Sequence, residues 1–282
     1  MKEAPVNVGG AALGLMVTAC VTGASHRDKS IPCQDASFAG VHFFKSHPYA
    51  LIAVADGHGS ASYARSELGA HFAVQSAAEA AARWIAFAVD CLDQNPEDWV
   101  ANAQNDFGSR FARMLKQAWT RHVTEHLSSN PLEGPELTPD AMYQCYGTTI
   151  AMALVFHDQV YAGAIGDSAV IVVTDGEGDA KSIDWLAGGS ASHLGLITDS
   201  LASDNAVSCW SHRVFALREV ALLCAVTDGF TDSLRDVSEA LRSLCRDRHE
   251  RGLPWLVQQL PPFAHSACVL THLLSVLRDE GY

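Results

Sequence analysis

Ala53-Val54-Ala55-Asp56-Gly57-His58-Gly59 is an apolar run that leads directly into an Asp-Gly-His-Gly turn. An apolar strand that ends in a carboxylate, a glycine and an imidazole can place a metal ligand and a proton carrier at the edge of a sheet. Asp56 offers a hard oxygen ligand, the Gly57 carbonyl offers a second, and His58 titrates near neutral pH. Taken alone, an Asp-Gly turn after a strand is more often an ordinary hairpin turn.

Further short motifs accompany this stretch along the chain. They are Gly-Ala-Ser-His-Arg at 23–27, Pro-Cys-Gln-Asp-Ala at 32–36, Gly-Thr-Thr at 147–149, Ala-Gly-Ala-Ile-Gly-Asp-Ser at 162–168 and Leu-Leu-Cys-Ala-Val-Thr-Asp-Gly at 222–229. In this order and with these spacings, the motifs resemble those of the metal-dependent protein phosphatases of type 2C, in the compact form common in bacteria. The resemblance extends from about Gly14 to Phe230.

Length, composition and charge narrow the class of protein. A chain of 282 residues with 48% hydrophobic and 18% charged residues has the composition of an ordinary globular protein with a sizeable core. The net charge of -13 disfavours broad binding to nucleic acid or anionic membranes, because both would be repelled. The net charge does not exclude a phosphorylated partner if bound divalent metal ions supply positive charge at the binding site.

Cysteine usage and the N-terminal segment bear on localisation. The eight cysteines contain no Cys-x-x-Cys pair, which predicts reduced thiols in a cytoplasmic protein. The apolar segment 8–20 ends in Val-Thr-Ala-Cys, like a lipoprotein cleavage site, but Lys2 and Glu3 together make a weak start for an export signal. The resemblance makes this segment the first strand, and no stretch reaches membrane-spanning length.

Apolar runs and helical spacing predict the order of elements. Strands are expected at 13–21, 36–44, 49–55, 148–156, 159–165, 169–174, 213–217 and 220–226, with helices over 60–92, 97–127 and 238–250. The glycine- and serine-rich stretch 175–208 is predicted to be a surface flap, with 194–197 against the core. No linker splits the chain, so we expect a single domain over residues 1–282 with this flap as an insertion.

This order of elements fits two packed antiparallel sheets with helices outside them. The resemblance implies the same fold, an α+β four-layer αββα sandwich of two antiparallel sheets flanked by helices. It places the metals in a cleft at one end of the sheets.

The resemblance also implies hydrolysis of phosphoserine and phosphothreonine by a metal-activated water, without a covalent intermediate. Two Mn²⁺ or Mg²⁺ ions are expected, since strand-end carboxylates suit ions that prefer oxygen ligands. Asp56 would bridge the ions beside the Gly57 carbonyl, and Asp228 would complete the ligands of one ion.

Three more residues receive roles from the resemblance. Asp35 corresponds to an outer carboxylate that holds water on the metal, and His58 to the general acid for the leaving oxygen. Asp167 corresponds to an aspartate that helps to bind a third, weaker ion. Isolated residues of these types also occur as turn caps, and that alternative stays open for Asp167 and for His58.

Two departures from the family pattern lie near the N-terminus. Gln34 stands before Asp35 where the family usually has glutamate, although bacterial relatives often carry the same pair, so its amide oxygen is a candidate metal ligand. Ser30 occupies the position of the phosphate-binding arginine. Arg27 is the candidate to replace that arginine, with Lys29 as another nearby cation, and both could equally be solvated loop residues.

The largest departure lies near the C-terminus. Residues 264–270, Ala-His-Ser-Ala-Cys-Val-Leu, contain no acid where the family has Asp-Asp or Asp-Asn before the last strand. His265 or Ser266 would then occupy the ligand position, and one of the two ions is expected to bind weakly.

Three functions are therefore weighed. The first is a cytoplasmic serine/threonine phosphatase acting on a phosphoprotein, opposite a partner kinase. The second is a catalytically weak or inactive pseudophosphatase that binds a phosphoprotein or a kinase. The third is a hydrolase of a small phosphorylated metabolite.

Overall fold

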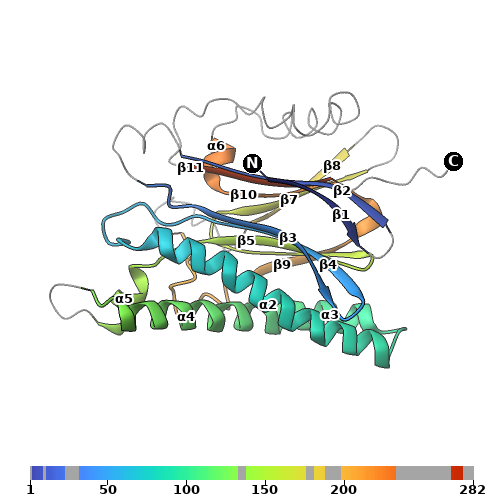
Figure 1. The fold of residues 1–282 in the computed structure, drawn as a ribbon, viewed down its shortest axis with the longest axis horizontal. Coiled ribbons are helices and arrows are strands. Elements are labelled where there is room, and N and C mark those ends of the chain that lie inside the picture. The colour runs from blue at the N-terminus through green and yellow to red at the C-terminus, as the bar shows by residue number, and fades with distance from the viewer. Residues whose placement is uncertain are drawn as a thin grey trace.

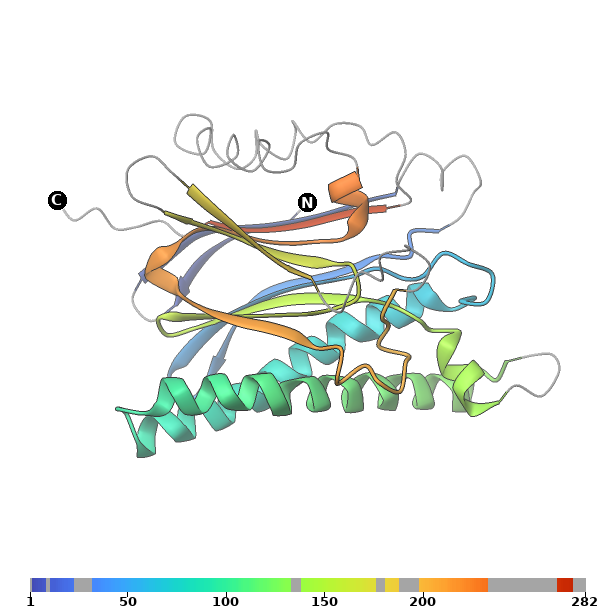
Figure 2. The same ribbon diagram turned by 180° about the vertical axis from the view of Figure 1, so that it is seen from behind.

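Two antiparallel sheets pack face to face, and long helices lie against the outer face of one of them (Figures 1 and 2). The computed structural model describes residues 2–8, 11–22, 32–132, 138–175, 181–187, 198–232 and 268–275. The six-stranded sheet has the order β1-β2-β11-β10-β7-β8, and the five-stranded sheet has the order β3-β4-β5-β6-β9.

The elements have the following bounds. The six-stranded sheet contains β1 Lys2–Val8, β2 Ala11–Thr22, β7 Ala169–Asp175, β8 Lys181–Ala187, β10 Val220–Val226 and β11 Cys268–Ser275. The five-stranded sheet contains β3 Ala36–Phe44, β4 His47–Ala55, β5 Ile150–Phe156, β6 Gln159–Ile165 and β9 Ser211–Ala216. The helices are α2 Ser66–Gln94, α3 Trp99–Asp106, the π-helical turn η1 Phe107–Phe111, α4 Ala112–Ser129, α5 Pro139–Gln144, the 3₁₀ turn η2 Leu217–Glu219 and α6 Asp228–Asp232.

Strand β4 shows why the central strands are apolar without interruption. Successive side chains point to opposite faces of a sheet. Ile52 and Val54 belong to the core between the two sheets, whereas Leu51 and Ala53 belong to the core under the helices. Because both faces of β4 are covered, both sets of side chains must be apolar.

Helix α2 lies close to its neighbours because its buried face is rich in alanine and contains one glycine. A Cβ at Gly69 would collide with the backbone carbonyl of Tyr146, so only glycine allows this approach. The carbonyl of Gly69 in turn accepts a hydrogen bond of 3.1 Å from the indole nitrogen of Trp119 on α4. This contact fixes α4 beside α2 under the sheet.

The predicted α+β sandwich of two antiparallel sheets with helices is confirmed, and three strands have the predicted bounds: β3, β6 and β10. The helix expected over 97–127 is divided by the π-helical turn η1, where Phe107 and Phe111 are both buried. The segment expected to be a flap contains β8, which pairs with β7, and its later part buries Leu201. The helix expected over 238–250 and residues 194–197 lie outside the described residues.

Across the described ranges, no helix combines the length and the apolar character needed to cross a membrane.

Candidate active site

Three aspartates meet where strands of both sheets end. Asp35 directly precedes β3 and Asp56 directly follows β4, and the pairing of Ala36 with Ala55 places these two aspartates side by side. Asp228 begins α6, after β10 of the other sheet. The carboxyl group of Asp56 lies within hydrogen-bond reach of those of Asp35 and Asp228. Residues that are far apart in the sequence thus form one carboxylate cluster.

Burial and mutual repulsion keep protons on this cluster. Burial, with a further contribution from the charge of Asp228, raises the pKa of Asp35 from the ordinary 3.8 to about 7. Burial is also the main reason that the pKa of Asp56 lies well above its usual range, followed by the charges of Asp35 and Asp228. Carboxylates gathered in this way are costly to ionise without a cation.

This donor set fits Mn²⁺ or Mg²⁺, which prefer oxygen ligands and remove the cost of ionising such a cluster. Within the described ranges, no three His, Cys, Asp or Glu side chains could hold a metal ion by themselves. The Gly57 carbonyl and water would therefore complete the ligands, which is usual for Mg²⁺ because it retains several waters.

The backbone of Asp56 is held by the two threonines that precede β5. Its carbonyl accepts hydrogen bonds from the backbone nitrogen of Thr149 at 2.9 Å and from Oγ1 of Thr148 at 2.8 Å. Its own N–H donates to Oγ1 of Thr149 at 3.1 Å. These bonds fix the turn at the end of β4, so Thr148 and Thr149 are positioning residues that the sequence motif marked without a role.

Gly57 is required by close packing. A Cβ at this position would lie 2.6 Å from the carbonyl oxygen of Gln34 and 2.8 Å from that of Ser66. The N–H of Gly57 donates to the same Gln34 carbonyl at 3.1 Å, and the Gln34 side-chain nitrogen donates to Oγ of Ser66 at 2.8 Å. Gln34 therefore links the Asp-Gly turn to the start of α2.

Thr227 is a site residue that sequence reasoning did not single out. Its buried hydroxyl donates a hydrogen bond of 3.3 Å to Oδ2 of Asp35, and this bond joins the end of β10 to the start of β3. Its position directly before Asp228, at the end of an apolar strand, is the signal that could have identified it.

His58 is held in place by contacts with Gly147 and Tyr63. Its backbone nitrogen donates to the Gly147 carbonyl at 3.1 Å, and its ring packs against Tyr63 with 4.7 Å between ring centroids. Burial lowers the pKa of His58, and the nearby charge of Asp167 partly opposes this effect. The Nε2 atom is buried and has no hydrogen-bond partner among the described residues.

Asp167 lies at the exposed border of the same site. It follows β6 and Gly166, which has a φ of 90°, a conformation that favours glycine. Its Oδ2 accepts a hydrogen bond of 2.9 Å from Thr198.

The structure thus brings together most of the residues that the sequence suggested. They are Gln34, Asp35, Asp56, Gly57, His58, Asp167 and Asp228. Arg27 and His265 lie outside the described residues.

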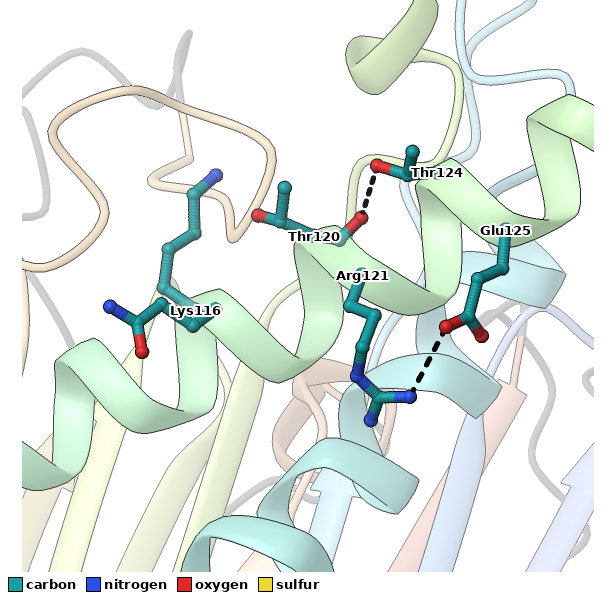
Figure 3. Close-up of a pocket in the computed structure, with 6 residues that line it drawn as sticks. Lys116, Thr120, Arg121, Thr124 and Glu125 are labelled. Atoms are coloured by element: carbon teal, nitrogen blue, oxygen red, sulfur yellow. Dashed lines mark hydrogen bonds and ion pairs between the residues drawn. The ribbon is translucent and has the colours of Figure 1, made fainter.

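A groove of about 380 Å³ lies on the exposed face of α4, and none of its lining residues belongs to the carboxylate cluster (Figure 3). Lys116 lines this groove, and its ammonium group donates a hydrogen bond of 2.5 Å to the carbonyl of Leu201. The N–H of Leu201 donates to the Thr148 carbonyl at 2.9 Å. The segment 198–210 therefore connects α4 to the turn that holds Asp56.

Comparison with known proteins identifies the family. A family model described as "Protein phosphatase 2C" matches residues 22–260, and the chain therefore belongs to the protein phosphatase 2C family. A comparison with curated proteins finds no match.

Solved structures of other phosphatases share the fold. The serine/threonine phosphatase Stp1 from Staphylococcus aureus is 17% identical, with 98% of each chain covered and a TM-score of 0.53. The serine-threonine phosphatase 2C from Toxoplasma gondii is 11% identical, with 98% of this chain and 99% of that chain covered and a TM-score of 0.62. The catalytic domain of the phosphatase PstP, in complex with two manganese ions, is 18% identical, with 93% and 97% covered and a TM-score of 0.52.

Proposed function

We propose that this chain is a metal-dependent protein serine/threonine phosphatase that uses Mn²⁺ or Mg²⁺. The observation that carries the proposal is the buried contact of Asp56 with Asp35 and Asp228, which gathers carboxylates from the ends of both sheets. Membership of the protein phosphatase 2C family supports it. A manganese complex of the structurally similar PstP supports the choice of metal.

When bound, the divalent ions would neutralise charge on the phosphoryl oxygens and lower the pKa of water. In this proposal Asp56 would hold both ions, with the Gly57 carbonyl as a ligand beside it, and Asp228 would be a ligand of one. Asp35 orients water by accepting its hydrogen bonds, and the Gln34 amide supplies a further oxygen. The mutual repulsion of the carboxylates is then offset by the ions rather than by protons.

His58 would donate a proton to the leaving alkoxide oxygen. Burial lowers its pKa in the free protein, so the protonated form needs negative charge nearby. The phosphate ester of the substrate and Asp167 provide that charge, and Asp167 is also proposed to help bind a weaker third ion. The role of Arg27 in holding phosphate stays a prediction.

The proposed substrate is a phosphoprotein in the cytoplasm, modified by a partner serine/threonine kinase. A pseudophosphatase that binds its target without hydrolysis is the second candidate. It is favoured by one observation, that residues 264–270 contain no aspartate or glutamate.

The test is phosphate release from a phosphothreonine peptide, with and without millimolar Mn²⁺. The Asp56→Asn and Asp228→Asn variants serve as matched controls, since each keeps the side-chain size and removes a charge. Metal-dependent release that both variants lose supports the phosphatase. Unchanged rates in both variants would refute it, and tight peptide binding without release would favour the pseudophosphatase.

A further inference from the structure

Two histidines from different hairpins meet at the end of the sheet opposite to the aspartates. His47 begins β4, and His157 lies in the turn between β5 and β6. Nδ1 of His47 lies 3.3 Å from Nε2 of His157. Because β4 runs from His47 to Ala55, just before Asp56, the pair lies on the order of 25 Å from the carboxylate cluster and cannot share an ion with it.

The spacing of these two nitrogens matches that of neighbouring ligands on a late first-row metal ion. Zinc–imidazole bonds of about 2.0–2.1 Å at a tetrahedral angle place two ligand nitrogens about 3.3–3.4 Å apart. The same separation permits an N–H···N hydrogen bond, in which one ring donates and the other accepts. A metal ion between the rings would replace that bond when the donating ring moves its proton to its other nitrogen.

The surroundings hold both rings in place. His157 has a φ of 51°, and its ring packs against Phe156 and Trp99, with centroids 4.6 Å and 5.6 Å away. His47 packs at 6.3 Å from the same Phe156 ring. Rings that are already oriented lose little freedom when they bind an ion.

The protonation state of His157 suits a ligand role. Burial and the neighbouring His47 lower the pKa of His157, and the charge of Asp158 partly opposes this. The His157 ring is therefore neutral near pH 7, which is the form that binds metal.

We propose that His47 and His157 form a two-histidine site for a late first-row divalent ion such as Zn²⁺, Ni²⁺ or Cu²⁺, with water as the remaining ligands. Imidazole nitrogens favour these ions over Mg²⁺ and Mn²⁺. The bound ion joins the β3–β4 hairpin to the β5–β6 turn. This site is separate from the proposed catalytic metals and does not depend on the proposed function.

Trp99 provides a local readout, since Cu²⁺ and Ni²⁺ quench an indole close to them and its ring lies 5.6 Å from His157. The full chain is titrated with Ni²⁺ in excess Mg²⁺, and the Trp99→Phe variant identifies the part of the quenching that belongs to this residue. We expect saturable quenching at one ion per chain, reversed by EDTA and competed by Zn²⁺. Zn²⁺ should also raise the melting temperature.

The matched variants are His47→Gln and His157→Asn, the latter because asparagine tolerates a positive φ. Each should weaken Ni²⁺ binding at least tenfold with an unchanged circular dichroism spectrum, and the double variant should abolish it. His212→Gln, at an exposed histidine of β9, should leave it unchanged. Absence of saturable Trp99 quenching, or the same quenching in the double variant, would overturn the proposal and leave the pair as a hydrogen bond alone.

Discussion

Replacing Asp35 by asparagine should stabilise the metal-free protein at alkaline pH. Burial holds the pKa of Asp35 at about 7 in the folded chain, whereas the unfolded chain has the ordinary value of 3.8. As pH rises between these values, the unfolded chain loses this proton first, so the free energy of unfolding falls. The contribution of this carboxyl group to the free energy of unfolding is fully present below pH 3.8 and is lost as the pH rises through about 7. Asparagine cannot ionise and can still accept the hydrogen bond from Thr227.

The expected magnitude follows from these two pKa values. A difference of one pKa unit corresponds to about 1.4 kcal/mol, so the wild-type chain should lose about 4 kcal/mol between pH 4 and pH 8 through this residue. The Asp35→Asn variant should be close to the wild type at pH 4. It should exceed the wild type at pH 8 by an amount of the order of 4 kcal/mol.

The assay is urea unfolding in EDTA at several values of pH from 4 to 8, followed by tryptophan fluorescence. Asp93→Asn, at an exposed position on α2, is the matched control and should keep the pH dependence of the wild type. Added Mn²⁺ should stabilise the wild type more than Asp35→Asn. The ion stabilises the ionised carboxylate of Asp35, and asparagine has no such charge. Equal pH slopes in the wild type and Asp35→Asn would refute the reasoning.

Three further predictions concern individual residues. Gly57→Ala should cost about 1–3 kcal/mol in urea unfolding, because its methyl group would collide with two backbone carbonyls. Gly59→Ala should leave the midpoint unchanged, because its methyl group would make only an ordinary van der Waals contact, 3.8 Å from Oε1 of Gln34. His58→Gln should lower kcat on a phosphothreonine peptide by about 10²-fold or more. It should lower kcat far less on p-nitrophenyl phosphate, whose leaving group needs no proton, and equal losses would argue against the acid role. Lys116→Met should free the segment 198–210 from α4, and hydrogen exchange there should increase while the protection of α2 is kept. Unchanged exchange would contradict that anchoring.

The strands of the fold were predictable from the sequence where their burial requires a continuous run of apolar side chains. Strands β3, β6 and β10 were predicted at their observed bounds, because β6 contributes to both cores, β10 is apolar and buried along its whole length, and β3 is bounded by polar turns. Strand β8 was missed because its sequence mixes charged and apolar residues, and its extended form comes from pairing with β7. The hydrophobic periodicity of a segment carries no information about a strand elsewhere in the chain with which it pairs.

The candidate site was predictable to a similar degree. Asp56, Gly57 and His58 follow one another in a motif, so their proximity needs no tertiary information. The family resemblance assigned Asp56, Asp35 and Asp228 to one metal site, and in the structure the carboxyl group of Asp56 lies against the other two. The hydrogen bond from Thr227 to Asp35 was not foreseen, because it joins residues at the ends of strands in different sheets.

The sequence alone determined that an apolar strand ends in Asp-Gly-His-Gly and that residues 264–270 carry no acid, since both are local properties of the chain. Only the tertiary structure decided how these groups behave. Burial, with a further contribution from the charge of Asp228, raises the pKa of Asp35 to about 7, and this burial depends on the packing of the two sheets. Bringing His47 within 3.3 Å of His157 likewise depends on the pairing of β4 with β5, which places distant residues side by side.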